Sequence, residues 1–195
     1  MGRVGAVILA AGGSSRLGQP KQLLSFRGET LVARVVRVAM KSGCDPVVVV
    51  VGENGNQIRT VLEGPGPTIV ENAEWPRGIG TSIHCGLLAC ADRIDAVVLL
   101  TCDQPFVDAA HISKLIATQA TTGKAVVASA YAQTLGVPAL FDRTCFDALL
   151  ALPPDAGAKS LISARSKDAA AVAFEEAAID IDTPADFERL IAERE

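Results

Sequence analysis

A glycine-rich segment near the N-terminus has the residue types of a phosphate-binding loop. It has the sequence LAAGGSSRLGQPK over residues 9–21 and begins inside the apolar run VGAVILA at residues 4–10. Glycines let a backbone approach a ligand closely, Arg16 can form paired hydrogen bonds to phosphate oxygens, and Lys21 can act as a point charge. The segment has neither the Gly-Lys-Ser/Thr end of a Walker A loop nor the spacing of a dinucleotide fingerprint. We interpret it as a polyphosphate-binding loop; a plain glycine turn between a strand and a helix is the alternative.

Two carboxylates in later segments have no evident structural role. Asp103 directly follows the apolar run AVVLLTC, and Asp108 is better placed than Asp103 to cap the next helix. Asp182 precedes Thr183, which begins a capping box with Asp186 and takes the capping role itself. A carboxylate beside a triphosphate is repelled unless a divalent cation lies between them, and Mg²⁺ prefers one or two carboxylates together with phosphate oxygens and water. The pattern predicts metal-assisted attack at phosphorus.

Other reactive side chains fit structural roles better. Thr81 and Ser82 follow NAEWPRGIG, and capping of the helix that starts there is the better interpretation for at least one of them. The alternative places backbone groups and Ser82 against a nucleobase or the incoming substrate, and spacing alone does not decide between the two. His84 and His111 lie in helical stretches, and no histidine stands near a candidate serine nucleophile. No Cys/His cluster has zinc spacing. The cysteines in apolar runs, which we expect to pack as small core residues, are Cys85, Cys90 and Cys102.

The elements that must position these residues alternate between strands and helices. Continuous β-branched runs are typical of strands that are buried on both faces of a parallel sheet. They occur at residues 4–10, 46–52, 67–72, 96–102 and 125–131. Helical spacing occurs between them at residues 29–42, 55–63, 80–91 and 108–122. This alternation predicts a Rossmann-like, doubly wound α/β fold with a mostly parallel sheet, whose ligand crevice lies at the carboxyl ends of the strands.

The C-terminal third departs from this alternation. GVPALF at residues 136–141 and helical stretches at 142–152 and 156–166 predict a small antiparallel addition to the sheet. The capping box at residues 183–186 has proline at the first helical position and predicts a final helix.

Composition narrows the class of protein. The chain has 195 residues, of which 49% are hydrophobic and 21% charged, so it is not disordered or fibrous, and we expect one folded domain over residues 1–195. No apolar run reaches the roughly 18 residues of a membrane span. The net charge of −4 argues against nucleic-acid binding, and five cysteines without a C-x-x-C pair favour a reducing cytoplasm. We expect a soluble, cytoplasmic protein that binds neither nucleic acid nor membrane.

Four motifs follow one another along the chain: LAAGGSSRLGQPKQLL at 9–24, NAEWPRGIGTSI at 72–83, DQP at 103–105 and DIDTPADF at 180–187. In this order they resemble the motifs of the molybdenum-cofactor nucleotidyltransferases, the MobA-like NTP transferases, with the closest likeness to their cytidylyltransferase branch. The motifs extend over nearly the whole chain. The first motif is shared by many nucleotidyltransferases, whereas the second and third point to the molybdopterin branch.

The resemblance implies a role for each matching position. It implies a catalytic set of Arg16, Lys21 and Asp103, and it implies Asp103 and Asp182 as ligands of Mg²⁺, with Mn²⁺ as the other possible ion. The positions that it implies for nucleotide binding are Leu9, Ala10, Ala11, Gly12, Gly13, Ser14, Ser15, Arg16, Lys21, Gly80 and Ser82. Residues 136–141 and 154–159 resemble the acceptor-binding region, although Pro154 stands where glycine is common in relatives.

The implied reaction is transfer of CMP from CTP to the terminal phosphate of molybdopterin, with release of pyrophosphate. Ala10 and Ala11 stand where the guanylyl branch has a glycine pair, which favours cytidine. The implied protein partner is a molybdenum hydroxylase that receives the product. Three alternatives stay open: a nucleotidyltransferase for another small phosphate such as a sugar 1-phosphate, an NAD(P)-dependent reductase on the same fold, and a non-catalytic chaperone that holds the cofactor.

Overall fold

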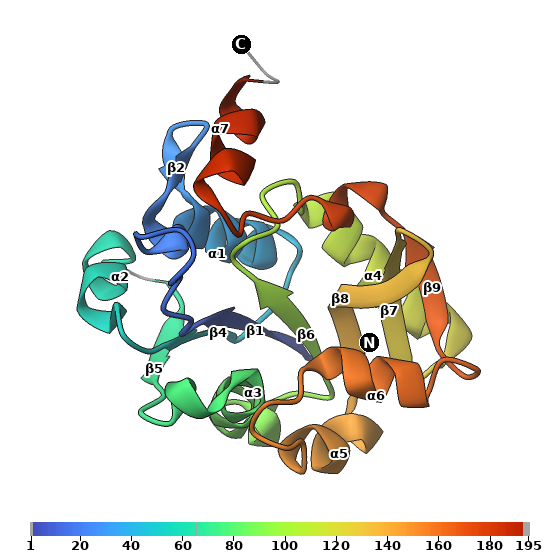
Figure 1. Cartoon of the computed structure of the whole chain (residues 1–195). Helices are drawn as coiled ribbons and strands as arrows, with labels where there is room; N and C mark the ends of the chain where they lie inside the picture. Colours follow the sequence, from blue (N-terminus) through green and yellow to red (C-terminus); the bar gives the residue numbers. More distant parts are fainter. Residues whose placement is uncertain (1, 65, 193–195) are drawn as a thin grey trace.

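Seven strands form one central sheet in the computed structural model, which describes residues 2–64 and 66–192 (Figure 1). The strand order is β5-β4-β1-β6-β8-β7-β9, and every neighbouring pair is parallel except the two pairs that include β8. The predicted mostly parallel α/β fold is therefore confirmed. The strands are β1 (Val4–Ala10), β4 (Val47–Val51), β5 (Thr68–Glu71), β6 (Ala96–Thr101), β7 (Val126–Tyr131), β8 (Thr134–Asp142) and β9 (Ala170–Ala173).

Helices cover both faces of the sheet, as the alternation of elements predicts. Side chains of α1 (Leu31–Lys41), α2 (Gly55–Val61) and α4 (Ala109–Thr122) pack in one hydrophobic core. Those of α3 (Ile79–Leu88), α5 (Phe146–Leu150) and α6 (Ala158–Ala164) pack in the core on the opposite face. Figure 1 shows α3, α5 and α6 below the sheet and α1 and α4 above it. No helix of the described residues has the length and apolar character that a membrane crossing requires.

The core strands owe their burial to runs of branched aliphatic residues. All five valines of β4 are buried, as expected for a strand covered on both faces. On the α3 side, Gly86 lets the helix approach the sheet, since a Cβ at this position would lie 2.4 Å from a methyl group of Val7. The interior therefore depends on close contact between α3 and β1.

The expected antiparallel addition is present, but its main strand lies inside the central sheet. The segment GVPALF belongs to β8, which is inserted between β6 and β7 and is antiparallel to both. A separate two-stranded antiparallel sheet is formed by β2 (Ser25–Phe26) and β3 (Glu29–Thr30). The segment 142–152 contains a 3-10 turn followed by α5, and 156–166 contains α6.

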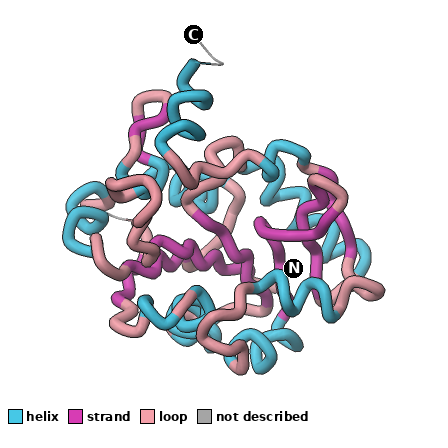
Figure 2. Tube along the Cα trace, viewed as in Figure 1, coloured by secondary structure: helices cyan, strands magenta, loops and turns pink. Residues whose placement is uncertain are grey.

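The C-terminal segment returns to the N-terminal one. The final helix, α7 (Pro184–Ala192), begins with the predicted capping box: Thr183 N donates to Asp186 Oδ2 at 2.8 Å, and Asp186 N donates to Thr183 Oγ1 at 3.3 Å. Figures 1 and 2 show α7 beside the β2 hairpin. These segments share a third hydrophobic cluster, made of Leu17, Leu24, Phe26, Leu31, Ile181 and Leu190.

Candidate active site

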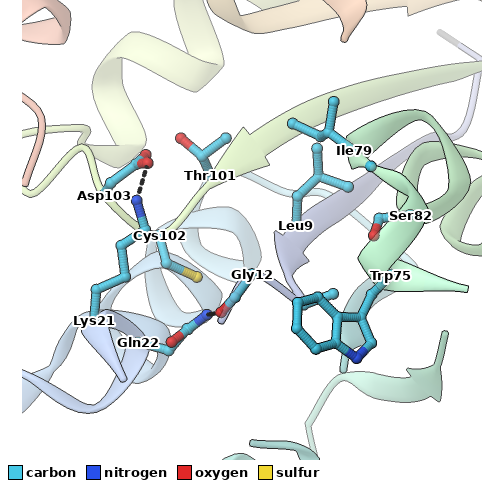
Figure 3. A pocket seen from close by; sticks show the side chains of 12 residues that line it. Leu9, Gly12, Lys21, Gln22, Trp75, Ile79, Ser82, Thr101, Cys102 and Asp103 are labelled. Carbon is cyan, nitrogen blue, oxygen red and sulfur yellow. Dashed lines mark hydrogen bonds and ion pairs between the residues drawn. The ribbon is translucent and has the colours of Figure 1, made fainter. Parts of the chain in front are cut away.

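A pocket of about 320 Å³ lies at the carboxyl ends of β1 and β6, where the fold predicts a ligand crevice (Figure 3). Side chains of the N-terminal loop and of the β6 tip form one side of it, and Leu9, Trp75, Ile79 and Ser82 form the other. The predicted nucleotide-binding residues that line it are Leu9, Ala11, Gly12, Lys21 and Ser82, and the predicted catalytic and metal-binding residue Asp103 lines it as well.

Lys21 joins two carboxylates at the edge of this pocket. It opens a short 3-10 helix (Lys21–Leu23), and its Nζ lies 2.7 Å from Asp103 Oδ2 and 3.1 Å from Asp182 Oδ1. Burial by itself lowers the pKa of Lys21, but the charge and hydrogen bonds of Asp103 and Asp182 outweigh burial, so this pKa is raised. Lys21 therefore stays protonated at neutral pH, although its side chain is only 19% exposed.

Arg16 approaches the same carboxylate from solvent. Its Nη2 lies 2.9 Å from Asp182 Oδ2, and its side chain is 69% exposed. Burial raises the pKa of Asp182, but hydrogen bonds and charges of Lys21 and Arg16 reverse that effect and lower it. The structure therefore brings together both cations and both carboxylates that the sequence singles out. The exposed guanidinium can leave this pair for a bound anion at little cost, because exposed ion pairs are weak.

Backbone contacts hold Asp182 near Asp103 although the two residues are far apart in sequence. Ile181, which is buried, donates its backbone N–H to the carbonyl of Asp103 at 3.0 Å. Gln104 Nε2 donates to the carbonyls of Val137 at 3.1 Å and Ala177 at 2.9 Å. The tip of β6 is thereby bound to β8 and to the segment that precedes α7.

Gln22 is a site residue that the sequence reasoning missed. It is 1% exposed, lines the pocket, and its Nε2 donates to the carbonyls of Ala10 at 3.0 Å and Gly12 at 2.8 Å. Its Oε1 is a buried atom without a hydrogen-bond partner among the described residues. The same turn contains Ser14 at φ 52°, and Ser14 Oγ accepts the backbone N–H of Lys21. The feature of the sequence that could have indicated it is a glutamine between Lys21 and the apolar pair Leu23 and Leu24.

The side-chain amide of Asn72 binds the hydroxyl groups of both Thr81 and Ser82. Its Nδ2 donates to Thr81 Oγ1 at 2.9 Å and to Ser82 Oγ at 3.0 Å, and Thr81 Oγ1 donates to the carbonyl of Gly78 at 2.7 Å. Among the described residues no side chain caps the start of α3, so the prediction that at least one of Thr81 and Ser82 caps this helix is wrong. Ser82 lines the pocket, where Asn72 orients its hydroxyl.

Several predicted nucleotide-site residues lie outside the lining of this pocket. The side chain of Ala10 packs in the core on the α1 side, and a Cβ on Gly13 would lie 2.6 Å from Glu53 Oε2. Gly80 faces the loop before α6: its N–H donates to Pro154 O at 2.8 Å, and a Cβ there would lie 2.1 Å from Pro153 O. The predicted residues outside the lining are Ala10, Gly13, Ser14, Ser15, Arg16, Gly80 and Asp182.

The histidines and most cysteines have the structural roles that we expect. His111 is 3% exposed and stacks on Phe174, with 4.1 Å between ring centroids. Ser129 Oγ donates to Pro138 O at 2.6 Å, so it accepts from His111 Nε2–H at 2.7 Å. Burial lowers the pKa of His111 to about 4, so the ring is neutral at pH 7. Cys90 and Cys102 are buried, Cys85 is half-buried, and burial raises the pKa of each.

The carboxylate pair fits a magnesium ion better than a protein-encased metal. No group of three or more His, Cys, Asp or Glu side chains in residues 2–64 and 66–192 is arranged to hold a metal. Asp103 and Asp182 supply two oxygens within hydrogen-bonding distance of one ammonium. Mg²⁺ takes one or two carboxylates and completes its shell with phosphate oxygens and water. These two carboxylates would hold such an ion, and a bound nucleotide would supply the remaining oxygens.

The chain belongs to a known family. Residues 6–170 match the MobA-like NTP transferase domain, and the chain is a member of that family. It is similar to the purine catabolism protein PucB of Bacillus subtilis, with 28% identity over 93% of both chains. It is also 35% identical to nicotine blue oxidoreductase of Paenarthrobacter nicotinovorans over 58% of this chain and 55% of that protein, so the chain spans about half the length of that relative.

Solved structures share the fold of this chain. Rv0371c of Mycobacterium tuberculosis H37Rv has 29% identity and a TM-score of 0.84 over 97% of both chains. A second structure of that protein, in complex with manganese, has 27% identity and a TM-score of 0.80 over 97% of this chain and 98% of that one.

Proposed function

We propose that the protein is a Mg²⁺-dependent nucleotidyltransferase that transfers CMP from CTP to the terminal phosphate of molybdopterin. The observation that carries the proposal is the ion-pair cluster in which Lys21 Nζ lies between Asp103 and Asp182 beside the pocket. Membership of the MobA-like NTP transferase family supports the general reaction, and the resemblance of residues 9–24 to the cytidylyl branch supports the nucleotide. Mn²⁺ is the second ion that we propose for the site. A molybdenum hydroxylase is the protein that we propose as recipient of the product.

In the proposed reaction an oxygen of the acceptor phosphate attacks the α-phosphorus of the nucleotide. The new bond joins this oxygen to phosphorus, the bond to the β-phosphate breaks, and its electron pair leaves with pyrophosphate. A divalent cation held by Asp103 and Asp182 would supply Lewis-acid neutralisation of phosphate oxygens. Lys21 and Arg16 stabilise negative charge on the phosphates, and no protein nucleophile takes part.

The charge balance explains why these four side chains stand together. The two carboxylates face two cations, so the cluster is neutral before substrate enters. A nucleoside triphosphate carries negative charge that can attract Lys21 and Arg16 away from the carboxylates. The carboxylates are then free to bind a cation. Nucleotide and metal should therefore bind cooperatively.

Pyrophosphate release tests the proposal. Purified protein is mixed with Mg²⁺ and one of CTP, GTP, ATP or UTP, in the presence of molybdopterin or a panel of sugar 1-phosphates. We expect the highest kcat/KM with CTP and molybdopterin. Turnover with a sugar 1-phosphate but not with molybdopterin would show that the acceptor is a sugar phosphate and not molybdopterin. Failure of every nucleotide to bind would contradict the proposal of a nucleotidyltransferase.

A second candidate function is an NAD(P)H-dependent reduction. The observation that favours it is the 35% identity with nicotine blue oxidoreductase over 114 residues. Oxidation of NADPH or NADH in the presence of a quinone-like dye, without consumption of any nucleoside triphosphate, would favour this function over nucleotidyl transfer.

A further inference from the structure

Gln22 has a buried side-chain amide that is satisfied on one side only. Its Nε2 carries two N–H groups, and these donate to the carbonyls of Ala10 at 3.0 Å and Gly12 at 2.8 Å. Its Oε1 is buried and has no hydrogen-bond partner within residues 2–64 and 66–192. Half a turn of the amide would not help, because Oε1 would then face two carbonyl oxygens. The side chain therefore serves as a donor of two hydrogen bonds, and its acceptor is left over.

Packing of the core does not explain a glutamine at this position. The residue is 1% exposed, and a buried acceptor without a donor lowers the stability of a fold. The next two residues, Leu23 and Leu24, pack against hydrophobic clusters. An apolar side chain at position 22 would suit these surroundings and would remove the unpaired oxygen. The amide is better explained by what its two N–H groups hold.

The two carbonyls that Gln22 holds belong to the segment that leads from β1 into the nucleotide pocket. Ala10 is the last residue of β1, and Gly12 lines the pocket. A Cβ on Gly12 would meet no atom within 4 Å among the described residues, so a ligand can approach this backbone closely. Figure 3 shows the amide of Gln22 directed at Gly12. A carbonyl oxygen turned towards a nucleotide would repel the oxygens of its phosphates and ribose, and the amide binds both carbonyls instead.

Side chains provide the polar links between this loop and the turn that contains Gln22. In the described part of the chain, no backbone–backbone hydrogen bond joins residues 10–14 to residues 20–24. The hydrogen bonds between the two segments are the two from Gln22 Nε2 and the one from Lys21 N to Ser14 Oγ at 3.0 Å. Gln22 therefore supplies most of the polar contact that fixes the start of the loop.

The ammonium group of Lys21 is held independently of Gln22. Its Nζ lies 2.7 Å from Asp103 Oδ2 and 3.1 Å from Asp182 Oδ1. Loss of the Gln22 amide should therefore release the start of the loop and leave the ammonium group in place.

We propose that Gln22 is a positioning residue for nucleotide binding, whose amide fixes the peptide groups from Ala10 to Gly12 in the orientation that the nucleotide requires. It acts through the backbone of the loop. This inference rests on the proposed nucleotidyl transfer, and it adds a residue that controls affinity for the nucleotide separately from Lys21, which stabilises charge on the phosphates.

Gln22→Met tests the proposal, because it removes both donors and the unpaired oxygen but keeps a long, unbranched side chain. Gln57→Met, at an exposed residue of α2, is the matched control. Binding of CTP with Mg²⁺ can be followed by the fluorescence of Trp75, the one tryptophan of the chain, which lines the pocket and lies 3.2 Å from the position of a Cβ on Gly13. We expect the Kd of CTP to rise about tenfold or more in Gln22→Met and to stay unchanged in Gln57→Met.

Kinetics and unfolding separate positioning from a purely structural role. In pyrophosphate release, the KM of CTP should rise with the Kd, whereas kcat at saturating CTP should stay within about threefold of the wild-type value, because Lys21 keeps its carboxylate contacts. The urea midpoint should stay close to that of the wild type, because the lost hydrogen bonds and the lost unpaired oxygen act in opposite directions. A wild-type Kd in Gln22→Met, or a fall in stability without a change in Kd, would overturn the proposal.

Gln22→Glu provides the second variant in case Gln22→Met does not fold. It keeps the shape of the side chain but offers at most one donor, and only when it is protonated. We expect its Kd for CTP to rise as well, and a Kd equal to that of the wild type would count against the role of the amide. Failure of the wild type to bind any nucleotide would instead contradict the proposed function, so titration of the wild type distinguishes the two results.

Discussion

At the scale of single residues, the candidate site is organised by one ammonium group between two carboxylates. Lys21 lies 2.7 Å from Asp103 and 3.1 Å from Asp182, and Arg16 contacts only Asp182. Lys21 is therefore the cation that both carboxylates share. Its raised pKa means that it keeps its positive charge throughout the neutral pH range, whether the partner is a carboxylate or a phosphate.

Lys21→Met removes that charge and keeps much of the side-chain volume. We expect turnover to fall by about 10² or more, because one electrostatic contact to the transition state has this typical effect. The measurement is kcat/KM for CTP from pyrophosphate release, with Lys41→Met at the exposed end of α1 as the control. A rate near that of the wild type would mean that Lys21 only neutralises Asp103 and Asp182.

Asp103→Asn keeps the shape of the side chain and removes its charge. We expect a loss of about 10² or more in kcat that excess Mg²⁺ does not restore, because an amide oxygen is a much weaker ligand for this ion than a carboxylate. Asp92→Asn, at a carboxylate with an 82% exposed side chain, is the control. Full activity of Asp103→Asn at saturating Mg²⁺ would remove Asp103 from the metal site.

At the scale of elements, the site depends on contacts between segments that the chain order keeps apart. The tip of β6 carries Asp103, and the segment before α7 carries Asp182. They are joined by the backbone hydrogen bond from Ile181 to Asp103 and by the amide of Gln104, which holds β8 and the turn before α7. Gln104 is thus a positioning residue for Asp182.

Gln104→Leu tests this connection. Two carbonyls lose their donor, and we expect the free energy of unfolding to fall by about 1–3 kcal/mol. Activity should fall further than this loss of stability explains, because the segment with Asp182 is released. Urea denaturation and kcat at a temperature where the variant is fully folded measure the two effects. Gln57→Leu, at an exposed residue of α2, is the control. An equal loss of stability and activity in Gln57→Leu would show that the effect is not specific to Gln104.

At the scale of the whole molecule, the N-terminal loop and the segment that leads into α7 pack against each other. The cluster that contains Leu17, Leu24, Ile181 and Leu190 packs the N-terminal loop against the C-terminal segment.

Away from the site, buried His111 links α4 to β7 through Ser129. This histidine makes the stability of the fold depend on pH.

Unfolding at acidic pH tests the role of His111. Burial lowers its pKa to about 4 in the folded state, against 6.5 for a free histidine. Between these pH values the unfolded state binds more protons, so the free energy of unfolding decreases as the pH falls, by on the order of 3 kcal/mol over the full range. His111→Leu should flatten this slope in urea denaturation from pH 7 to 4, whereas His84→Gln, at an exposed ring, should keep it. Equal slopes in both variants would contradict the assignment.

The order and type of the main elements could be predicted from the sequence because they depend on local patterns. The five valines of β4 predict a buried strand, and the apolar run of β1 followed by glycines predicts a strand that ends in a turn. Each of these patterns is contained in a few consecutive residues. The carboxylates Asp103 and Asp182 could be singled out for a similar reason, since nearby Asp108 and Thr183 take the capping roles.

Tertiary structure alone decided which of these residues meet. The sequence predicts that the two cations and the two carboxylates gather at one site, but it could not assign Arg16 to Asp182 and Lys21 to both carboxylates. Nor could it place β8 between β6 and β7 or turn Gly80 towards the loop before α6. It also did not reveal that Gln22 binds the carbonyls of the N-terminal loop. Local spacing determines the conformation of each segment, whereas contacts between distant segments follow from how all the apolar surfaces of the chain are buried at once.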